Sequence, residues 1–327
     1  MQIISFKYLF SLKKLHVVGL VGSIDNDFCG TDMTIGADSA LHRISECINN
    51  IQTTAYSHQR VFVLEVMGRH CGYLALSSAI ACGADYVFLP EAPPSAGWEE
   101  QLKNQLQLSR EVGGRRTGIV IVSEGAIDKE GRKITTDYIK TILSDEYDTR
   151  VTILGHVQRG GNTSAYDRIL STRMGIEAAK ALTEASNDDD LAQVIVVKQN
   201  KIIRASMMDL VRRTKMAQQA LADKDFEKLE GLRGMNFRAN FRMFKRLTKI
   251  NLNRNFEGKI KKRIAIMATG APCSGMNSVL RTAVLSLINH PDEKYYYEPL
   301  VISDGFEGLM NGDIQVWDDL QVVLSNM

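Results

Sequence analysis

The carboxylates of a short loop, Gly22-Ser-Ile-Asp-Asn-Asp27, are the first candidates for chemistry in this chain. Side chains alternate along a strand, so Ser23, Asp25 and Asp27 point to the same side if extended geometry persists through the loop. Two neighbouring carboxylates repel each other, which is unfavourable unless a cation or a catalytic need offsets it. An Asp within hydrogen-bond reach of a hydroxyl is the usual base of phosphoryl transfer. A turn with two solvated carboxylates is the simpler interpretation of these residues alone.

A second group consists of arginines in or beside glycine-containing loops. Arg69 follows Met67 and Gly68, and Arg159 precedes two glycines, with His156 close by in the sequence. Guanidinium groups bind phosphate oxygens bidentately and stay charged, so such a cluster suits a sugar phosphate. Glycine lets a ligand approach the backbone, which favours a binding role for these two loops.

The most specific pattern runs from Arg150 to Arg168, RVTILGHVQRGGNTSAYDR. An arginine is followed by a short apolar run, by GHVQRGG, by small residues and by an Asp-Arg pair. This stretch closely resembles the phosphofructokinase signature, and the resemblance extends from about Leu15 to Phe306. It implies an ATP-dependent 6-phosphofructokinase of the eukaryotic, duplicated type, a glycolytic phosphotransferase that converts ATP and fructose 6-phosphate to ADP and fructose 1,6-bisphosphate.

The resemblance also implies roles for single residues. Asp25 is expected to accept the proton of the sugar 1-hydroxyl, and Asp27 to help place the transferring phosphoryl group with its Mg²⁺. Arg69 is expected to face the charge that develops during transfer, whereas Arg60 and Arg150 would reach the 6-phosphate from a neighbouring subunit of a homo- or hetero-oligomer. The residues expected to bind the substrate are Ser23, Ile24, Asp25, Arg60, Met67, Gly68, Arg69, Glu124, Arg150, His156, Val157, Gln158 and Arg159.

The donor is expected to be ATP, because Gly22 stands where pyrophosphate-dependent relatives usually carry a lysine. Mg²⁺ is the cofactor that accompanies ATP in this resemblance. The first ATP-binding segment is expected upstream of residue 1, so no ATP ligand and no metal ligand is assigned within the chain. A Rossmann-type dehydrogenase would need a GxGxxG turn after the first strand, which the loop from Gly22 to Asp27 does not provide.

Apolar runs and helical patterns alternate along the first half of the chain. This alternation predicts an α/β fold with Rossmann-like, doubly wound parallel sheets, here of the phosphofructokinase type. Each candidate loop follows the carboxyl end of a predicted strand, the edge at which open parallel sheets bind ligands. Strands are expected at 16–21, 60–66, 85–89, 118–122 and 151–154, and helices at 35–53, 73–82, 99–112 and 164–185.

The remainder of the chain has a different pattern. Between Gln199 and residue 263 we expect no strand but two basic amphipathic helices, at 207–232 and 237–247. From Lys198 to Arg263 there are 19 Lys and Arg against 6 Asp and Glu, a net charge of +13. Basic stripes can bind nucleic acid, but without aromatic stacking repeats a solvated helix face is favoured and no nucleic-acid partner is expected.

A strand, a glycine turn and a helix then begin again at residue 263, and a second strand is expected at 298–303. The turn from Gly270 to Asn277 resembles the nucleotide-type loop that opens the second half of the duplicated enzymes. Such a turn before a helix can hold a phosphate. The expected organisation is an unmatched segment 1–14, a catalytic half 15–197, a basic helical connector 198–262 and the incomplete start of a regulatory half 263–327.

Both ends depart from the family pattern, so the chain resembles an enzyme truncated at either end. Positioning and electrostatics supply most of the rate in phosphoryl transfer. We therefore expect the isolated chain to have little or no kinase activity. A non-catalytic regulatory subunit or a pseudoenzyme that retains the sugar-phosphate pocket is the alternative.

Bulk properties point to the cytoplasm. Five cysteines form no CxxC pair, and six histidines show no metal-ligand spacing. The first twenty residues lack the features of a signal peptide, and no apolar run approaches the roughly 18 residues of a membrane span. We expect neither a membrane partner nor a zinc site.

Overall fold

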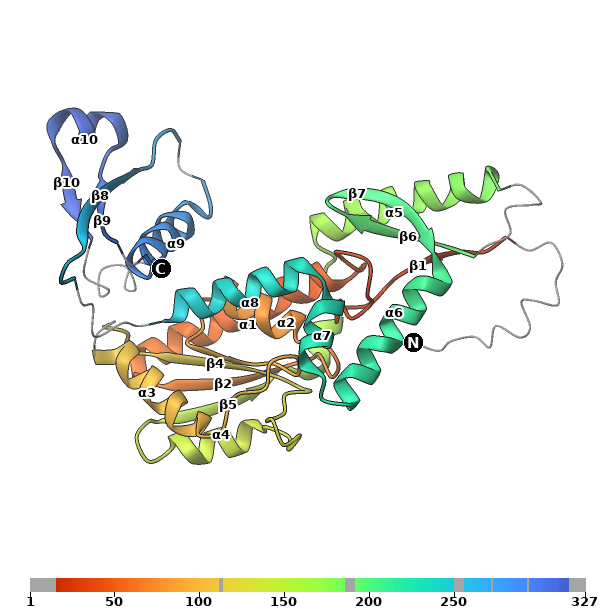
Figure 1. The fold of residues 1–327 in the computed structure, drawn as a ribbon, viewed down its shortest axis with the longest axis horizontal. Helices are drawn as coiled ribbons and strands as arrows, with labels where there is room; N and C mark the ends of the chain where they lie inside the picture. Colours follow the sequence, from red (N-terminus) through yellow and green to blue (C-terminus); the bar gives the residue numbers. More distant parts are fainter. Residues whose placement is uncertain are drawn as a thin grey trace.

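The α/β fold predicted from the sequence is confirmed in the computed structural model (Figure 1), which describes residues 16–111, 114–185, 192–249, 256–271, 273–292 and 294–317. The described strands form three sheets, with the orders β3-β4-β2-β5, β1-β6-β7 and β10-β9-β8. The strands are β1 (Val18–Leu20), β2 (Val61–Val66), β3 (Tyr86–Phe88), β4 (Gly118–Ser123), β5 (Thr149–Ile153), β6 (Gln193–Lys198), β7 (Lys201–Ser206), β8 (Ile260–Met267), β9 (Tyr295–Ile302) and β10 (Ile314–Val316). The helices are α1 (Ala37–His58), α2 (Tyr73–Ala81), α3 (Trp98–Glu111), α4 (Thr136–Leu143), the 3₁₀ helix η2 (Gly155–Arg159), α5 (Ala165–Thr183), α6 (Met207–Ala222), α7 (Phe226–Arg233), α8 (Met235–Thr248), α9 (Met276–Ile288) and α10 (Gly305–Asn311).

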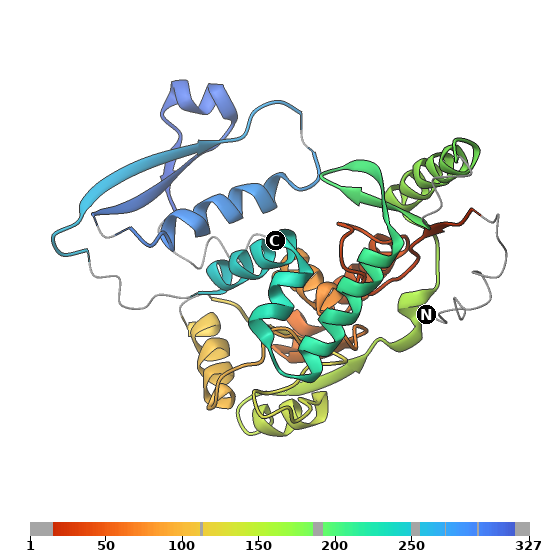
Figure 2. The ribbon, with the colours of Figure 1, turned by 45° about the vertical axis from the view of Figure 1, so that its right-hand side comes forward.

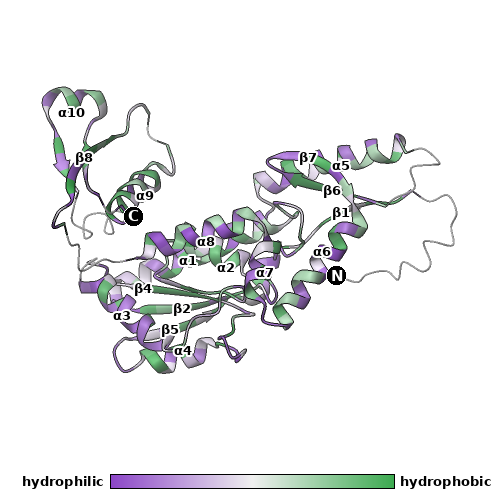
Figure 3. Cartoon of the chain, in the orientation of Figure 1, coloured by the Kyte–Doolittle hydropathy of each residue, from purple (hydrophilic) through white to green (hydrophobic). Residues whose placement is uncertain are grey.

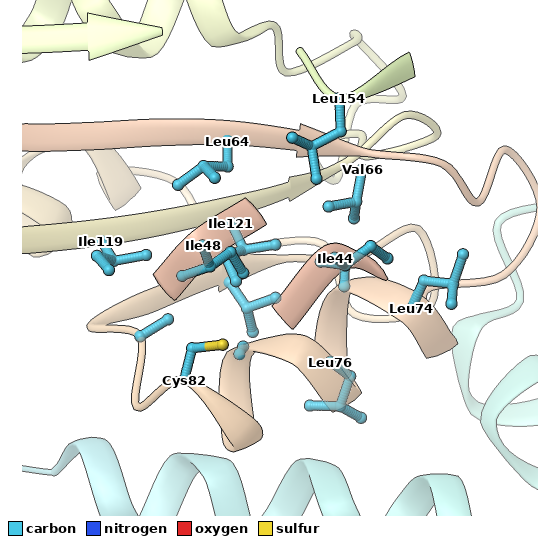
Figure 4. Close-up of a cluster of buried hydrophobic side chains, with 14 of the residues drawn as sticks. Ile44, Ile48, Leu64, Val66, Leu74, Leu76, Cys82, Ile119, Ile121 and Leu154 are labelled. Atoms are coloured by element: carbon cyan, nitrogen blue, oxygen red, sulfur yellow. The ribbon is translucent and has the colours of Figure 1, made fainter. Parts of the chain in front are cut away.

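The central sheet is fully parallel and is covered on both faces. Because side chains alternate along a strand, Leu64 and Ile121 face α1 and α2, while Val63 and Val120 face α3 and α4. Figure 4 shows the first of these clusters, in which Ile44 of α1 packs with side chains of β2 and β4. Burial on both faces explains why these strands appear in the sequence as continuous apolar runs. The strands of this sheet are mainly hydrophobic in Figure 3.

The first predicted strand lies in a separate sheet. β1 pairs in parallel with β6, and β6 pairs with β7 as an antiparallel hairpin. The expectation that no strand lies between Gln199 and residue 263 is therefore wrong, because β7 lies there. The hairpin turn consists of Gln199 and Asn200, both with positive φ, so it lacks the glycine that usually marks such a turn. The strand β7 also mixes charged with apolar residues and is only partly buried, which hides it from an apolar-run search.

The connector is more closely packed than a solvated linker. The helix expected over 207–232 is two helices, because the chain turns at Lys224 (φ 58°) and Asp225 caps α7 by accepting a hydrogen bond from the Lys228 amide at 3.1 Å. Phe237 and Phe244 of α8 are buried in the same core as α1 and α2. α8 therefore forms an outer layer over the central sheet, with hydrophilic residues between its hydrophobic ones in Figure 3.

The last described part carries the β8-β9-β10 sheet with α9 and α10 (Figure 2). β8 and β9 are parallel, and α9 packs on β9. Contact with the connector runs through α8, where an Arg246 amino group donates to the Ser286 carbonyl at 2.6 Å. The strand, glycine turn and helix expected from residue 263 are all present.

Candidate functional site

The loops that follow β2, β4 and β5 are held together at the carboxyl edge of the central sheet. The Met67 amide donates to the Gln158 side-chain oxygen at 3.1 Å, which joins the loops after β2 and β5. The Ser123 hydroxyl donates to the Gly68 carbonyl at 2.7 Å, which joins the loops after β2 and β4. Three segments far apart in the sequence thus present their side chains at one place.

Asp25 comes to this place from the other sheet, in the loop after β1. Burial is the main reason that the pKa of its carboxyl is raised, and the negative charge of Asp27 raises it further. Arg159 and His70 act in the opposite direction, so both lie close enough to stabilise the carboxylate. One carboxylate oxygen, Oδ1, is buried and has no hydrogen-bond partner among the described residues. An oxygen in this state is available to accept a proton from a ligand.

The loop from Gly22 to Asp27 is a turn rather than a continued strand. Asn26 adopts a left-handed conformation (φ 48°), and its side-chain oxygen accepts a hydrogen bond from the Thr34 amide at 2.9 Å. The Ser23 hydroxyl still meets the Asp27 carboxylate, at 2.9 Å. The two side chains therefore lie together, but strand alternation is not the reason. Asn26 was missed in the sequence, although Asn is one of the few residues other than glycine that often adopt this conformation.

Arg69 and Glu124 form an ion pair at the mouth of the site, with 3.0 Å between the Arg69 amino group and Glu124 Oε1. Arg69 is 72% exposed and Glu124 27% exposed, so both can reach a ligand from the solvent side. Gly125 lies directly under this pair. A Cβ atom at Gly125 would come within 1.9 Å of the Arg69 carbonyl oxygen, so only glycine permits this close approach.

The signature segment forms η2 at the end of β5. Gln158 is buried, and its amide group donates to the Gly155 carbonyl at 2.9 Å in addition to accepting from Met67. Both polar atoms of Gln158 are therefore used to fix the loops. His156, Val157 and Arg159 are exposed and free to meet a ligand. A cavity of about 330 Å³ lies beside η2. It is lined by residues of the Asp25 loop, of the segment that leads into α1, and of the segment from η2 to α5, namely Ile24, Ile35, Gly36, Ser39, Ala40, Gln158, Arg159, Gly160, Gly161, Thr163, Asp167 and Ser171.

Asp167, from the Asp-Arg pair of the signature, has a structural role. Its carboxylate accepts hydrogen bonds from the Gly36 amide (3.1 Å), the Ser39 amide (2.8 Å) and the Ser39 hydroxyl (2.6 Å). These donors lie at the beginning of α1, so a fully buried carboxylate caps a helix that is distant in the sequence. Asp167 thereby fixes α1 behind the Asp25 loop.

Arg60 and Arg150 lie near the amino ends of β2 and β5, away from the loops described above. Both bind Asp148, at 2.7 Å from Arg60 Nε and 3.0 Å from an Arg150 amino group. Within one chain they do not join the cluster around Asp25. Their predicted action on a neighbouring subunit stays a prediction.

Neither a metal cluster nor a membrane helix is found in the part of the chain that the structure describes. In those residues no group of three or more His, Cys, Asp or Glu side chains is placed to hold a metal ion. None of the described helices is both long and apolar enough to cross a membrane. Asp25 and Asp27 are nevertheless a pair of hard oxygen donors, and Mg²⁺ is commonly held by one or two carboxylates together with substrate phosphates.

Comparison with known proteins identifies the family. The phosphofructokinase family model matches residues 4–182 and 263–326. The chain belongs to the phosphofructokinase family. This match begins inside the segment 1–14 that the sequence patterns leave unassigned. It leaves out residues 183–262, which include the whole predicted connector 198–262.

The curated relatives are longer proteins. The chain is 50% identical over 310 residues to the human "ATP-dependent 6-phosphofructokinase, liver type" and 51% identical over 310 residues to the human platelet type. The dog muscle type is 50% identical over 304 residues. Each alignment covers 92–94% of this chain but 38% of the relative, so the chain spans well under half of their length.

Solved structures give the same result. Phosphofructokinase from Saccharomyces cerevisiae superposes with a TM-score of 0.85 at 40% identity, covering 98% of this chain and 42% of that chain. The Pichia pastoris enzyme in the T-state gives 0.84 at 41% identity, covering 95% and 33%. The two structures thus confirm the phosphofructokinase fold for almost the whole chain.

Proposed function

We propose that this chain binds fructose 6-phosphate at the carboxyl edge of its central sheet and carries the base for its phosphorylation by ATP. The observation on which the proposal rests is the Asp25 carboxylate. Its buried oxygen Oδ1 has no hydrogen-bond partner in the described part of the chain and lies among groups from three other loops. The names of the relatives, all ATP-dependent 6-phosphofructokinases, support the substrate pair. Gly22 in place of a lysine is in keeping with ATP as the donor.

The proposed reaction is a direct phosphoryl transfer. The 1-hydroxyl oxygen of the sugar attacks the γ-phosphorus, the bond between that phosphorus and the ADP oxygen breaks, and Asp25 takes the hydroxyl proton. The raised pKa of Asp25 makes its carboxylate a stronger base than an exposed Asp. Mg²⁺, held by Asp27 and the donor's phosphates, would neutralise charge on those phosphates.

The remaining residues would bind and orient the substrate. Arg159 and His156 are exposed cationic or hydrogen-bonding groups on η2, suited to the sugar phosphate. Glu124 is suited to sugar hydroxyls, and Arg69 to the charge that develops during transfer. The 6-phosphate ligands Arg60 and Arg150 would come from a second subunit, which makes an oligomer part of the proposal.

Calorimetric titration of the 327-residue chain with fructose 6-phosphate tests the binding step. Arg69→Met or Arg159→Met should raise the Kd about tenfold or more, because a hydrogen bond to a charged group contributes about 1.5–3 kcal/mol. Arg173→Met is the matched control, since Arg173 is exposed on α5 and donates to the Asn200 carbonyl far from the loops. Equal affinities in all three variants would contradict the assignment.

The catalytic step needs its own measurement. Asp25→Asn should leave the Kd for fructose 6-phosphate within a few-fold, because the amide keeps a hydrogen-bonding oxygen, while removing any turnover. Fructose-6-phosphate-dependent ADP release measures the turnover. The expectation that the isolated chain has little activity stays a prediction, which the same assay tests.

A further inference from the structure

Arg233, the last residue of α7, is buried between the loops of the candidate site although it belongs to the predicted connector. Its side chain is 5% exposed, and that of its ion-pair partner Glu91 is fully buried. Arg233 Nε donates to Glu91 Oε1 at 2.9 Å, and one amino group donates to the Asp27 carbonyl at 2.9 Å. The other amino group donates to the His70 carbonyl. Each nitrogen of the guanidinium therefore binds a different loop.

Glu91 adds a further contact to this link, with the Gly72 amide. It follows β3, and both of its carboxylate oxygens accept a hydrogen bond from the Gly72 amide, at 3.1 Å and 2.9 Å. Gly72 immediately precedes α2 and closes the loop that carries Arg69 and His70. The pair Arg233–Glu91 therefore ties together the loops after β1, β2 and β3.

This link spans a gap that the backbone leaves open. β1 belongs to the three-stranded sheet and β2 to the four-stranded sheet, and no ladder joins these two sheets in the described residues. Parallel pairing consequently fixes neither the distance nor the orientation between Asp25 and Arg69. Side-chain contacts have to set this geometry. The planar guanidinium with its rigid donors is well suited to hold two carbonyl oxygens and a carboxylate at fixed positions.

We propose that Arg233 is a positioning residue for the sugar-phosphate site, and that it holds the Asp25–Asp27 loop against the Arg69–His70 loop. The inference rests on the proposed function for its ligand. Arg233 itself does not touch the substrate, and its guanidinium is fully engaged with protein acceptors. A displacement of about 1 Å between binding or reacting groups can cost about a hundredfold in rate, so small movements of these loops matter.

The alternative is that Arg233 only stabilises the fold. A suitable control exists, because Arg115 makes the same kind of contact elsewhere. One Arg115 amino group binds the buried Asp85 at 2.7 Å, and the other donates to the Gly83 carbonyl at 2.8 Å. This pair lies at the amino side of β3 and β4, at the opposite edge of the sheet from the site loops. Arg115→Met removes a partly buried arginine, paired with a buried carboxylate, without touching the loops.

The experiment compares Arg233→Met, Arg233→Lys and Arg115→Met in the full chain. A fourth variant combines Arg233→Met with Glu91→Gln. This double variant avoids leaving a buried unpaired carboxylate, and the side-chain amide introduced by Glu91→Gln keeps an oxygen that can still accept from the Gly72 amide. Fructose 6-phosphate affinity is measured by calorimetry, unfolding by urea, and loop opening by amide hydrogen exchange at residues 25–28 and 68–72.

We expect the Kd for fructose 6-phosphate to rise about tenfold or more in Arg233→Met and in the double variant, and less in Arg233→Lys, which keeps the charge but not the three-way geometry. Hydrogen exchange should accelerate in both loops of the Arg233 variants and in neither loop of Arg115→Met. The Arg115→Met Kd should stay within about twofold of the wild type, even where its urea midpoint falls as far as that of Arg233→Met.

Two results would overturn the inference. One is an affinity in the double variant equal to that of the wild type, and the other is an equal loss of affinity in Arg115→Met at equal loss of stability. Failure of the proposed function gives a different pattern. In that case the wild-type chain itself shows no saturable binding of fructose 6-phosphate, whereas the exchange comparison still reports whether Arg233 holds the two loops.

Discussion

Replacing Asp167 by alanine should destabilise the fold by removing the cap of α1. The carboxylate is fully buried and accepts from two backbone amides, of Gly36 and Ser39, and from the Ser39 hydroxyl. The hydroxyl can turn to another acceptor, but the two amides are fixed at the helix terminus. Each buried donor left without a partner costs about 1–3 kcal/mol.

The two amides together give a loss of about 2–6 kcal/mol. The lower part of this range is expected, because Asp167 lines the cavity of about 330 Å³ and water can reach the orphaned donors from it. We therefore predict that Asp167→Ala lowers the free energy of unfolding by about 2–4 kcal/mol. Asp167→Asn keeps one acceptor but turns an amino group toward a donor, so it should lose about half as much.

Urea unfolding followed by circular dichroism measures the loss. Asp137→Ala is the matched control, because Asp137 also lies in the first turn of a helix but is exposed, and Thr135 rather than Asp137 caps α4. This control should lose no more than about 0.5–1 kcal/mol. A loss below about 1 kcal/mol in Asp167→Ala would refute the cap as the role of this signature residue.

Three further predictions concern the site loop, the arginine loop and the connector. Asp25→Asn should raise the free energy of unfolding at pH 7. The pKa of Asp25 is raised in the folded state, so its protonated form stabilises the fold. This contribution to the free energy of unfolding is complete below the ordinary pKa of an Asp, about 3.9. It is lost as the pH rises through the higher pKa of the folded state. The gain in Asp25→Asn should therefore vanish in acid, and urea curves at several pH values would show a constant difference if this reasoning fails. Gly125→Ala should weaken fructose 6-phosphate binding more than Arg69→Met does, because the new Cβ displaces the backbone of the whole Arg69 loop, and calorimetry would contradict this if the order were reversed. Phe244→Ala should cost about 3–5 kcal/mol in urea unfolding, because its ring is buried in the main core, and a cost below about 1 kcal/mol would mean that α8 is only loosely attached.

Long, strongly patterned elements were predictable from the sequence. The central strands are buried on both faces, so their apolar runs are uninterrupted, and α1 shows its helical spacing clearly. α4 was missed because a helix of eight residues offers little more than two turns of pattern. The hairpin β6-β7 was missed because its second strand is half exposed and its turn contains no glycine.

Some features of the candidate site could likewise be predicted from the sequence, and others could not. Short loops after predicted strands made Asp25, Arg69 and Arg159 candidates, because parallel strands deliver their carboxyl ends to one edge. The family resemblance added Glu124. The sequence could not show that Asp25 arrives from a different sheet. That depends on strand pairing between residues about 175 apart, in the register Gly19 with Val194.

The sequence by itself determined the family and the fold class, and it predicted which side chains form the candidate site, since these depend on residue types at short spacings. Tertiary structure alone decided which groups act together. Asp167 caps a helix whose first residue lies 130 positions earlier, and Arg233 binds the carbonyl of Asp27 across 206 positions. Such contacts leave no periodic trace in the chain, because backbone carbonyls and amides are the same in every residue. Only folding brings a particular carbonyl within reach of a particular guanidinium.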